Sequence, residues 1–362
     1  MSKARQLAQK PTQPTGRKNL IINGAMQVAQ RGTSVTGQTA GQYNTVDRLM
    51  LEVSGGTYDH EQSTDAPNGF KNSVKVTNSG AFTPTASQYF IPFEFRFERD
   101  DLAHLAYGTS DAKTVTLSFW IKSNKTGTYT VDFYNSPGNR RWAQSYTIDV
   151  ANTWEQKTLT WTGDTSQSFG SGTSGGGYFY FWMTGGTNFT SGSLPSDWEN
   201  LNNANRAVGV PTSLADGDAF YLTGVQLEVG SVATEFEHRS YGEELALCQR
   251  YYQIAALYTI SGFYNMKWQG LPTNIFSTTR AFFSLEFPVE MRAYPTITVD
   301  SPLFYVASNG ASKTITTQPS NTYQSTTGIG IDMSNSGSNF TVGAGAHTDL
   351  GSGCKITVDA EL

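Results

Sequence analysis

The chain has 362 residues, of which 15% are charged, and its formal net charge is −5. Residues 1–18 carry five basic side chains and no acid, so the remaining residues sum to −10. An acidic body argues against duplex nucleic acid as the main ligand, because a phosphate footprint would make the body basic as well. The 36 glycines and the 13% of aromatic residues favour short strands and tight turns over helices, and the length leaves room for two domains.

The first segment, residues 1–18, reads "MSKARQLAQKPTQPTGRK". It has no hydrophobic periodicity, which predicts an extended arm that cannot bury a core of its own. We expect this arm to bind another protein through its basic side chains, which are Lys3, Arg5, Lys10, Arg17 and Lys18. The chain contains neither a secretory signal nor a run of about 18 apolar residues, so we expect no membrane insertion.

Residues 19–239 consist of strand-sized pieces joined by polar turns. In "TVTLSFWIK" the residues Val115, Leu117, Phe119 and Ile121 share one face, and polar residues with Trp120 share the other. This period of two is typical of a half-buried strand. Eight or more such pieces predict a sandwich of two antiparallel sheets.

Two long loops rich in Gly, Ser and Asn interrupt these strands, at 168–179 and 183–203. Loops of this length in a compact sandwich are common binding sites, and solvated filler is the equally ordinary alternative. Trp182 and Trp198 lie in or near these loops. Trp142 follows a turn and comes directly after Arg140 and Arg141. Aromatic rings with polar neighbours suit sugar binding, whereas packing between sheets or at subunit contacts would use the same rings.

A short helix is predicted at 240–253, "SYGEELALCQRYYQ". Ser240 and Glu243 have the spacing of a capping box. Leu245, Cys248 and Tyr252 fall on one helical stripe, which needs a cover at a domain or subunit contact. Residues 254–362 then read as strands again and predict a second, smaller β-domain, thin enough to be completed by neighbouring copies of the chain.

Catalytic constellations are hard to find in the sequence. The four histidines lack metal-binding spacing, and neither a nucleophile elbow nor a phosphate-binding loop occurs. Adjacent acids at Asp216/Asp218 and Glu243/Glu244 are interpreted as a turn and as helix capping. We therefore expect no enzyme activity and no cofactor. The two cysteines, Cys248 and Cys354, are expected to be buried thiols.

Two stretches carry a specific resemblance: "NLIINGAMQVAQRGTS…YNTVDRLMLE" and "FYLTGVQLEVGSVATEFEHRSYGEELALCQRYYQ". They resemble phage and prophage tail-fibre or receptor-binding proteins, and the strands between them are similar to carbohydrate-binding jelly-roll modules. The resemblance implies an all-β chain with a jelly-roll sandwich, a short helix and a second, smaller β-domain. It also implies a homotrimer on the virion that is attached by the arm 1–18 to another virion protein and presents β-domains to host-surface glycans.

The alternatives to a tail fibre are a capsid decoration fibre and a depolymerase tailspike. Carbohydrate-binding jelly rolls also often hold a structural calcium ion near the ends of their first and last strands. The matching positions here are Asn23 or Asp47 and Asp216 or Asp218, whose spacing is not diagnostic. The sequence leaves calcium as an option.

Overall fold

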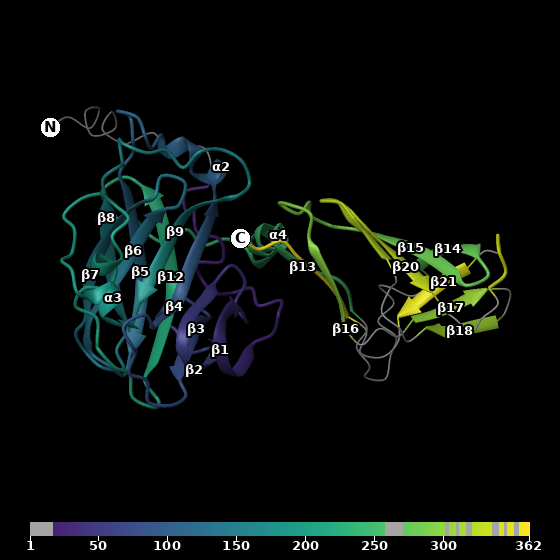
Figure 1. The fold of residues 1–362 in the computed structure, drawn as a ribbon, viewed down its shortest axis with the longest axis horizontal. Coiled ribbons are helices and arrows are strands. Elements are labelled where there is room, and N and C mark those ends of the chain that lie inside the picture. The colour runs from purple at the N-terminus through teal and green to yellow at the C-terminus, as the bar shows by residue number, and fades with distance from the viewer. Residues whose placement is uncertain are drawn as a thin grey trace. The chain divides into compact units, whose positions relative to one another are not determined.

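The computed structural model describes residues 17–257, 271–300, 304–308, 311–315, 321–334, 340–343, 346–350 and 355–362. The chain forms two compact units (Figure 1). The larger unit extends to Glu244 and includes Leu362, and the smaller unit comprises Leu245–Glu361. No helix in the described residues is both long and apolar enough to cross a lipid bilayer.

The larger unit is built almost entirely from antiparallel strands. Its strands are β1 (Ser34–Tyr43), β2 (Met50–Ser63), β3 (Ser73–Asn78), β4 (Tyr89–Glu98), β5 (Val115–Ser123), β6 (Gly127–Asn135), β7 (Arg140–Ile148), β8 (Glu155–Trp161), β9 (Gly175–Trp182), β10 (Thr184–Gly185), β11 (Glu199–Asn200) and β12 (Ala219–Val229). The helical turns between them are α2 (Arg99–Leu102), η1 (Ala103–Leu105), α3 (Thr187–Thr190) and η2 (Asn203–Asn205). The hydrogen-bonded order is β11-β7-β6-β9-β4-β2-β3-β12-β5-β8.

Strand β2 passes from one layer of the sandwich to the other. Its residues 50–54 pair with β4, and its residues 58–63 pair with β3. Gly55 and Gly56 lie between these halves at φ 105° and 81°, a region that glycine adopts without a steric penalty. The bend divides the strand order into a first sheet, β11-β7-β6-β9-β4-β2, and a second sheet, β2-β3-β12-β5-β8.

The core of the larger unit lies between these two sheets. Alternate residues of each strand enter it, as the period-two pattern predicts. Phe119 of β5, for example, packs edge-to-face against Phe181 of β9, with ring centroids 5.1 Å apart. The predicted all-β fold, a jelly-roll sandwich followed by a short helix and a smaller β-domain, is confirmed.

The helix α4 (Tyr241–Gln249) is shorter than expected. The expected capping box is present: the Glu243 N–H donates to Ser240 Oγ at 3.3 Å, and the Ser240 N–H donates to Glu243 Oε2 at 2.9 Å. Tyr252, however, begins strand β13 (Tyr252–Leu257) and pairs with Asp359. The expected helical stripe therefore loses Tyr252, because strand pairing overrides the helical spacing there.

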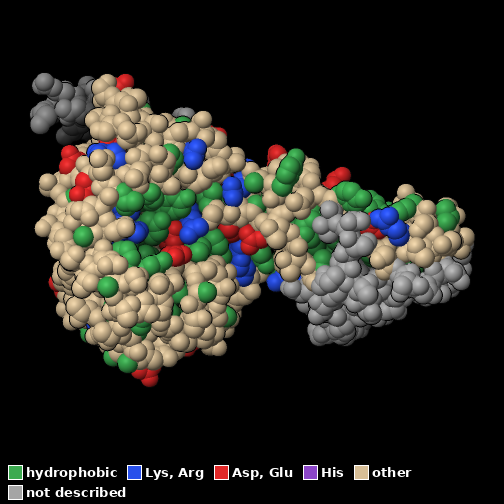
Figure 2. Space-filling view, in the orientation of Figure 1, with side chains coloured by type: hydrophobic (Ala, Val, Ile, Leu, Met, Phe, Trp, Pro, Cys, Tyr) green, Lys and Arg blue, Asp and Glu red, His purple; other side chains and the backbone are tan. Residues whose placement is uncertain are grey.

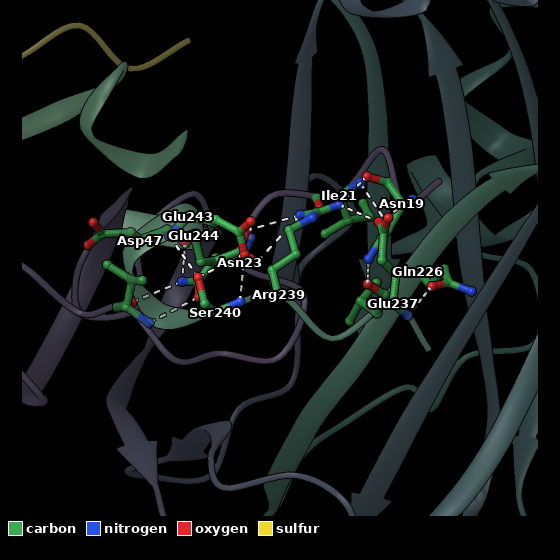
Figure 3. Close-up of polar contacts among 12 residues, drawn as sticks. Asn19, Ile21, Asn23, Asp47, Gln226, Glu237, Arg239, Ser240, Glu243 and Glu244 are labelled. Atoms are coloured by element: carbon green, nitrogen blue, oxygen red, sulfur yellow. Dashed lines mark hydrogen bonds and ion pairs between the residues drawn. The ribbon is translucent and has the colours of Figure 1, made fainter. Parts of the chain in front are cut away.

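The two stretches that carry the family resemblance meet in one polar network (Figure 3). Asn19 Nδ2 donates to the Val225 carbonyl at 3.0 Å, and the Asn19 N–H donates to Glu237 at 2.8 Å. Arg239 pairs with Glu237 at 2.9 Å and with Glu244 at 3.2 Å. The residues that look like a family signature thus fix the N-terminal segment of the sandwich to the segment before the helix.

The smaller unit contains two antiparallel sheets. The first has the order β13-β22-β16, and the second has the order β18-β17-β21-β14-β15-β20-β19. The further strands are β14 (Leu271–Ser277), β15 (Arg280–Glu286), β16 (Thr296–Asp300), β17 (Phe304–Ser308), β18 (Ala311–Ile315), β19 (Asn321–Gln324), β20 (Gly328–Ser334), β21 (Ala346–Leu350) and β22 (Lys355–Asp359). Its core includes Phe283, Leu285, Ile329, Ile331 and Val358.

Candidate functional site

The outer face of the first sheet concentrates aromatic and charged side chains. Residues that alternate with the buried phenylalanines of β6 and β9 point to this face, among them Asp132, Tyr134, Tyr178, Tyr180 and Trp182. Figure 2 shows hydrophobic, basic and acidic side chains gathered in a depression on the larger unit, between surfaces of mostly uncharged residues.

Strand β4 adds to this face through an irregularity in its pairing. Met50 pairs with Glu94 and Glu52 pairs with Ile91, so β4 has one extra residue between these pairs. Pro92 lies in this bulge, where a residue without an N–H is tolerated. The bulge changes the phase of the strand, so that Ile91 and Glu94 both lie on the outer face.

A cavity of about 190 Å³ opens on this face, and we call it the Trp182 pocket. Three aromatic side chains, two acids, two arginines and one isoleucine line it. They are Glu52, Tyr89, Ile91, Glu94, Arg96, Tyr180, Trp182 and Arg206.

Trp182 is fully buried, and its indole Nε1 has no hydrogen-bond partner among the residues that the structure describes. Its ring packs against Phe189 and Tyr89, with ring centroids 5.1 and 5.7 Å apart respectively. An unpaired buried donor costs about 1–3 kcal/mol. This N–H is therefore a buried donor that the described residues leave unsatisfied.

Arg206 covers the aromatic rings of the pocket. Its guanidinium carbon lies 4.7 Å from the Trp182 ring centroid and 5.1 Å from that of Tyr180. Its Nε donates to Asp132 at 3.2 Å, which fixes the plane of the guanidinium group. Asp132 also forms an ion pair with Arg141 at 3.0 Å, and burial lowers the pKa of Arg141 against the opposing effect of Asp132.

The opposite wall of the pocket is a chain of charged groups. Arg96 donates to both oxygens of Glu94, at 2.6 and 3.2 Å, and lies 4.0 Å from Glu52. The Tyr89 hydroxyl donates to Glu52 at 2.8 Å. Burial raises the pKa of Glu94, although Arg96 opposes this, and burial with the Glu52 contact raises the pKa of Tyr89 to about 12.

The sugar-binding residues predicted from the sequence separate into two groups. Trp182 and Arg141 lie on the outer face and are connected through Asp132 and Arg206. The other three residues lie together elsewhere and are Trp142, Trp198 and Arg140.

In the second group, Trp198 is 8% exposed, and its Nε1 donates to the Thr162 carbonyl at 2.7 Å. Trp142 lies edge-to-face with Trp198 at 6.4 Å. Arg140 donates to Asp164 at 2.8 Å and to the Trp198 carbonyl at 2.8 Å. These contacts stabilise the turn region after β6 and satisfy the indole N–H of Trp198 and the guanidinium of Arg140 with protein acceptors.

Most of the pocket residues were missed by the sequence analysis. The signal was present in "YFIPFEFRFE" and "GGGYFYFW", in which tyrosines and charged residues alternate with phenylalanines. Outward tyrosines on a strand are ordinary, so the alternation alone does not identify a site. Arg206 comes from the turn after η2 and had no local signal.

The arm and helix predictions are only partly within the described residues. Lys3, Arg5 and Lys10 lie outside them. The Lys18 N–H donates to Glu237 at 3.1 Å and its Nζ donates to Thr234 at 2.7 Å, so Lys18 is fixed to the sandwich. Arg17 also has an interaction within the structure.

In the helix region, Leu245 is half-buried, whereas Cys248 and Tyr252 are buried. The burial of Cys248 agrees with the expectation of a buried thiol. Cys354 lies outside the described residues.

The positions considered for calcium are already bonded to protein groups. Asn23 Nδ2 donates to the Val28 and Asp47 carbonyls at 2.9 Å each. The Asp47 carboxylate accepts from the Gln30 N–H at 2.9 Å, and Asp218 pairs with Lys125 at 3.1 Å. Within the described part of the chain, no three His, Cys, Asp or Glu side chains cluster as metal ligands would. Asp216, the remaining position considered, is exposed.

No family model matches the chain. No curated protein matches it either. Solved structures similar to it include the enzymatically active domain of tailspike protein 4 of bacteriophage CBA120, at 15% identity and a TM-score of 0.30, covering 59% of this chain and 21% of that chain. A CBM4 structure matches at 14% identity and a TM-score of 0.29, covering 57% of this chain and 98% of that chain.

A family 61 carbohydrate-binding module in complex with β-1,4-galactotriose matches at 9% identity and a TM-score of 0.30, covering 59% of this chain and 100% of the module. The chain thus spans about a fifth of the length of the tailspike structure and nearly all of the two binding modules. All three TM-scores lie below 0.5, so the ligand and the partners of this chain are inferred below from its own residues.

Proposed function

We propose that the chain is a non-enzymatic structural subunit of a bacteriophage virion, a tail-fibre or receptor-binding protein, that binds a host-surface glycan in the Trp182 pocket. The observation that supports glycan binding most directly is the buried, unpartnered Nε1 of Trp182 in a pocket lined by aromatic and charged side chains. The virion role is supported by the resemblance of the sequence to phage fibre proteins.

The pocket offers both kinds of contact that a sugar needs. A pyranose has an apolar C–H face, which stacks on rings such as Tyr89 and Tyr180, and a rim of hydroxyl groups. The Trp182 N–H would donate to one hydroxyl oxygen, and Glu52 would accept from another. Hydrogen bonds to charged groups are stronger than those between neutral groups, so Arg206 and Glu52 would set the orientation of the sugar.

The size of the pocket indicates weak binding at each site. Its volume of about 190 Å³ is below the range of about 300–1,000 Å³ that is common for drug-sized ligands. One sugar residue would occupy it, with an affinity in the millimolar to micromolar range. In the proposed homotrimer, three such sites on one fibre would raise the avidity through effective concentration.

Glycoside hydrolysis is the second candidate, because the carboxylates of Glu52 and Glu94 line the same pocket. Binding is favoured over hydrolysis because Arg96 donates to both oxygens of Glu94 and so opposes the protonation that a general acid needs. Incubation of the protein with host polysaccharide should release no new reducing ends. Release that is abolished in Glu94→Gln would establish the depolymerase alternative.

The binding experiment compares two tyrosines in equivalent surroundings. Tyr180 and Tyr221 are half-buried on the outer faces of different sheets, and each has a cation over its ring, Arg206 at 5.1 Å and Lys122 at 4.3 Å. Tyr180→Ala should weaken binding of host polysaccharide about tenfold in calorimetry, and Tyr221→Ala should leave it unchanged. Equal effects of the two substitutions would contradict a site in the Trp182 pocket.

The position of the chain on the particle remains part of the proposal. A tail fibre and a capsid decoration fibre would both use the arm 1–18 to attach to another virion protein and would both present β-domains outward. Immunogold labelling of particles with an antibody to the smaller unit separates the two. Label on the tail supports the tail fibre, and label on the head supports the alternative.

A further inference from the structure

The smaller unit has a hollow of its own, on the outer face of its seven-stranded sheet. Strand β20 alternates between Ile329 and Ile331, which are buried in the core, and Gly328 and Gly330, which lie on the other face. Gly330 pairs with Tyr323 of β19 on one side and with Ser284 of β15 on the other. Because Gly330 has no side chain, the Phe282 ring of β15 lies close over it and forms part of the floor of the hollow.

The walls of this hollow are aromatic and its rim is polar. The cavity has a volume of about 340 Å³ and is called the Tyr323 hollow. Two aromatic rings, the hydroxyl groups of two serines and one threonine, one side-chain amide and one carboxylate line it, together with backbone and apolar atoms. The lining residues used below are Phe282, Ser284, Glu286, Tyr323, Gln324 and Gly330.

The glycine at position 330 is required by the close approach of a ring. A Cβ atom there would lie 2.4 Å from the Phe282 ring, closer than real contacts allow. Phe282 and Tyr323 lie 5.9 Å apart at an angle of 68°. Tyr323 is 59% exposed, whereas Phe282 is half-buried, so more than half of the tyrosine surface is accessible to a ligand.

We propose that the Tyr323 hollow is a second glycan site, separate from the Trp182 pocket, and that it takes a neutral pyranose. The exposed tyrosine face would stack on the C–H face of the sugar, and Ser284 and Gln324 would bond to its hydroxyl groups. The hollow is larger than the Trp182 pocket, at about 340 Å³ against about 190 Å³, so more than one sugar residue fits.

The charge of the hollow selects against acidic sugars. Glu286 is the carboxylate among its lining residues, and no arginine or lysine lines it. The nearby charge of Asp332 is balanced by its ion pair with Arg280. An approaching uronate or phosphate would therefore meet a like charge, whereas a neutral sugar would bond to Glu286 through its hydroxyl groups.

The test uses the full chain carrying Arg206→Gln, which weakens the first site, and ligand-observed saturation-transfer NMR. The probes are methyl galactoside, methyl glucoside and glucuronate. Tyr323→Ala should reduce the signal from the neutral sugars about fivefold. Tyr294 is the matched control, because it is 71% exposed in the same unit and does not line the hollow. Tyr294→Ala should leave the signal unchanged.

Glu286→Gln tests the charge argument separately. It should raise the signal from glucuronate while the neutral sugars keep theirs within about twofold, because the like-charge repulsion is removed. Equal signals from the Tyr323→Ala and Tyr294→Ala proteins would overturn the site. In the protein that retains Glu286, a glucuronate signal as strong as that of the neutral sugars would overturn the proposed selectivity. Both results are expected whether or not the Trp182 pocket binds a sugar, so the two proposed sites are tested independently.

Discussion

The backbone N–H of Asn23 donates to the Glu244 carboxylate at 2.5 Å, across 221 residues of sequence. Asn23 has a φ of 60°, the left-handed region that asparagine tolerates better than most residues. Glu244 is buried and also pairs with Arg239 at 3.2 Å. One carboxylate thus closes the N-terminal turn and neutralises the arginine that bonds the same segment.

The first prediction follows from this contact. Glu244→Ala leaves the Asn23 N–H without its carboxylate acceptor and removes one of the two carboxylates that pair with Arg239, so it should lower the free energy of unfolding by about 2–4 kcal/mol. Glu243→Ala is the control, because that neighbour is exposed and bonds to Ser240 within the capping box. Urea titration of both variants checks this, and a larger effect at Glu243 would contradict it.

The sequence predicted the fold well where local pattern decides structure. The alternation of "TVTLSFWIKS" placed β5 correctly, and the capping box at Ser240 placed the start of α4. It failed at Tyr252, where pairing with Asp359 across 107 residues ends the helical phase. The bulge at Pro92 and the approach of Arg206 to Trp182 also depend on contacts between distant strands and loops. Local pattern does not encode such contacts, so most of the Trp182 pocket was not predicted.

The second prediction concerns His60, which is fully buried in β2. Its Nδ1 lies 2.7 Å from Thr45 Oγ1, and burial lowers its pKa to about 3. In the unfolded chain His60 binds a proton near pH 6.5, whereas in the folded chain it stays neutral until about pH 3. The neutral imidazole therefore contributes its full share of the free energy of unfolding above pH 6.5, and this share is lost as the pH falls towards 3.

The measurement is the free energy of unfolding between pH 7 and pH 4 for the parent and for His60→Leu. In the parent, the free energy of unfolding should fall by about 1.4 kcal/mol per pH unit, the slope that corresponds to uptake of one proton on unfolding. His60→Leu should lack this component although its stability at pH 7 is altered. Parallel pH profiles for the two proteins would show that His60 is charged in the fold.

The third prediction separates binding from stability at Trp182. Trp182→Phe keeps a ring and removes an N–H that has no partner, so it should cost about 1–2 kcal/mol of stability through the small cavity alone. Glycan affinity should fall about fivefold to tenfold, because the donor to the sugar is lost.

Trp161→Phe is the matched control, since Trp161 is equally buried but its Nε1 donates to the Trp142 carbonyl at 2.9 Å. This substitution should cost more stability and leave the affinity unchanged. Calorimetry and thermal unfolding of both variants check the prediction. An unchanged affinity in Trp182→Phe would remove that N–H from the site.

The fourth prediction tests the proposed homotrimer. Leu245 is half-buried on α4, and a charge there would face any subunit contact that the helix makes. Leu245→Asp should dissociate the assembly in light scattering, whereas Ala246→Asp, at an exposed neighbour, should not. A parent protein that scatters as a monomer at micromolar concentration, with unfolding independent of concentration, would contradict the trimer.

The last prediction concerns the arm 1–18 and the residue at which a truncation should end. Lys18 bonds to Glu237 and Thr234, so it belongs to the folded sandwich, whereas the composition of the preceding residues predicts an extended segment. Deletion of residues 1–17 should leave the melting temperature unchanged within about 1 °C and abolish incorporation into particles. Deletion of residues 1–19 should lower the melting temperature, because it also removes Asn19 and its bonds to Val225 and Glu237.

Docking of the intact arm should weaken as salt is added, because its basic side chains Lys3, Arg5 and Lys10 would meet acidic groups that salt screens. Pro11 and Pro14 restrict the free arm and lower the entropy lost on docking. Replacing both prolines with alanine should therefore weaken incorporation without affecting folding. Particles that assemble normally with the 1–17 deletion would place the attachment surface on the folded body and remove the arm from the proposal.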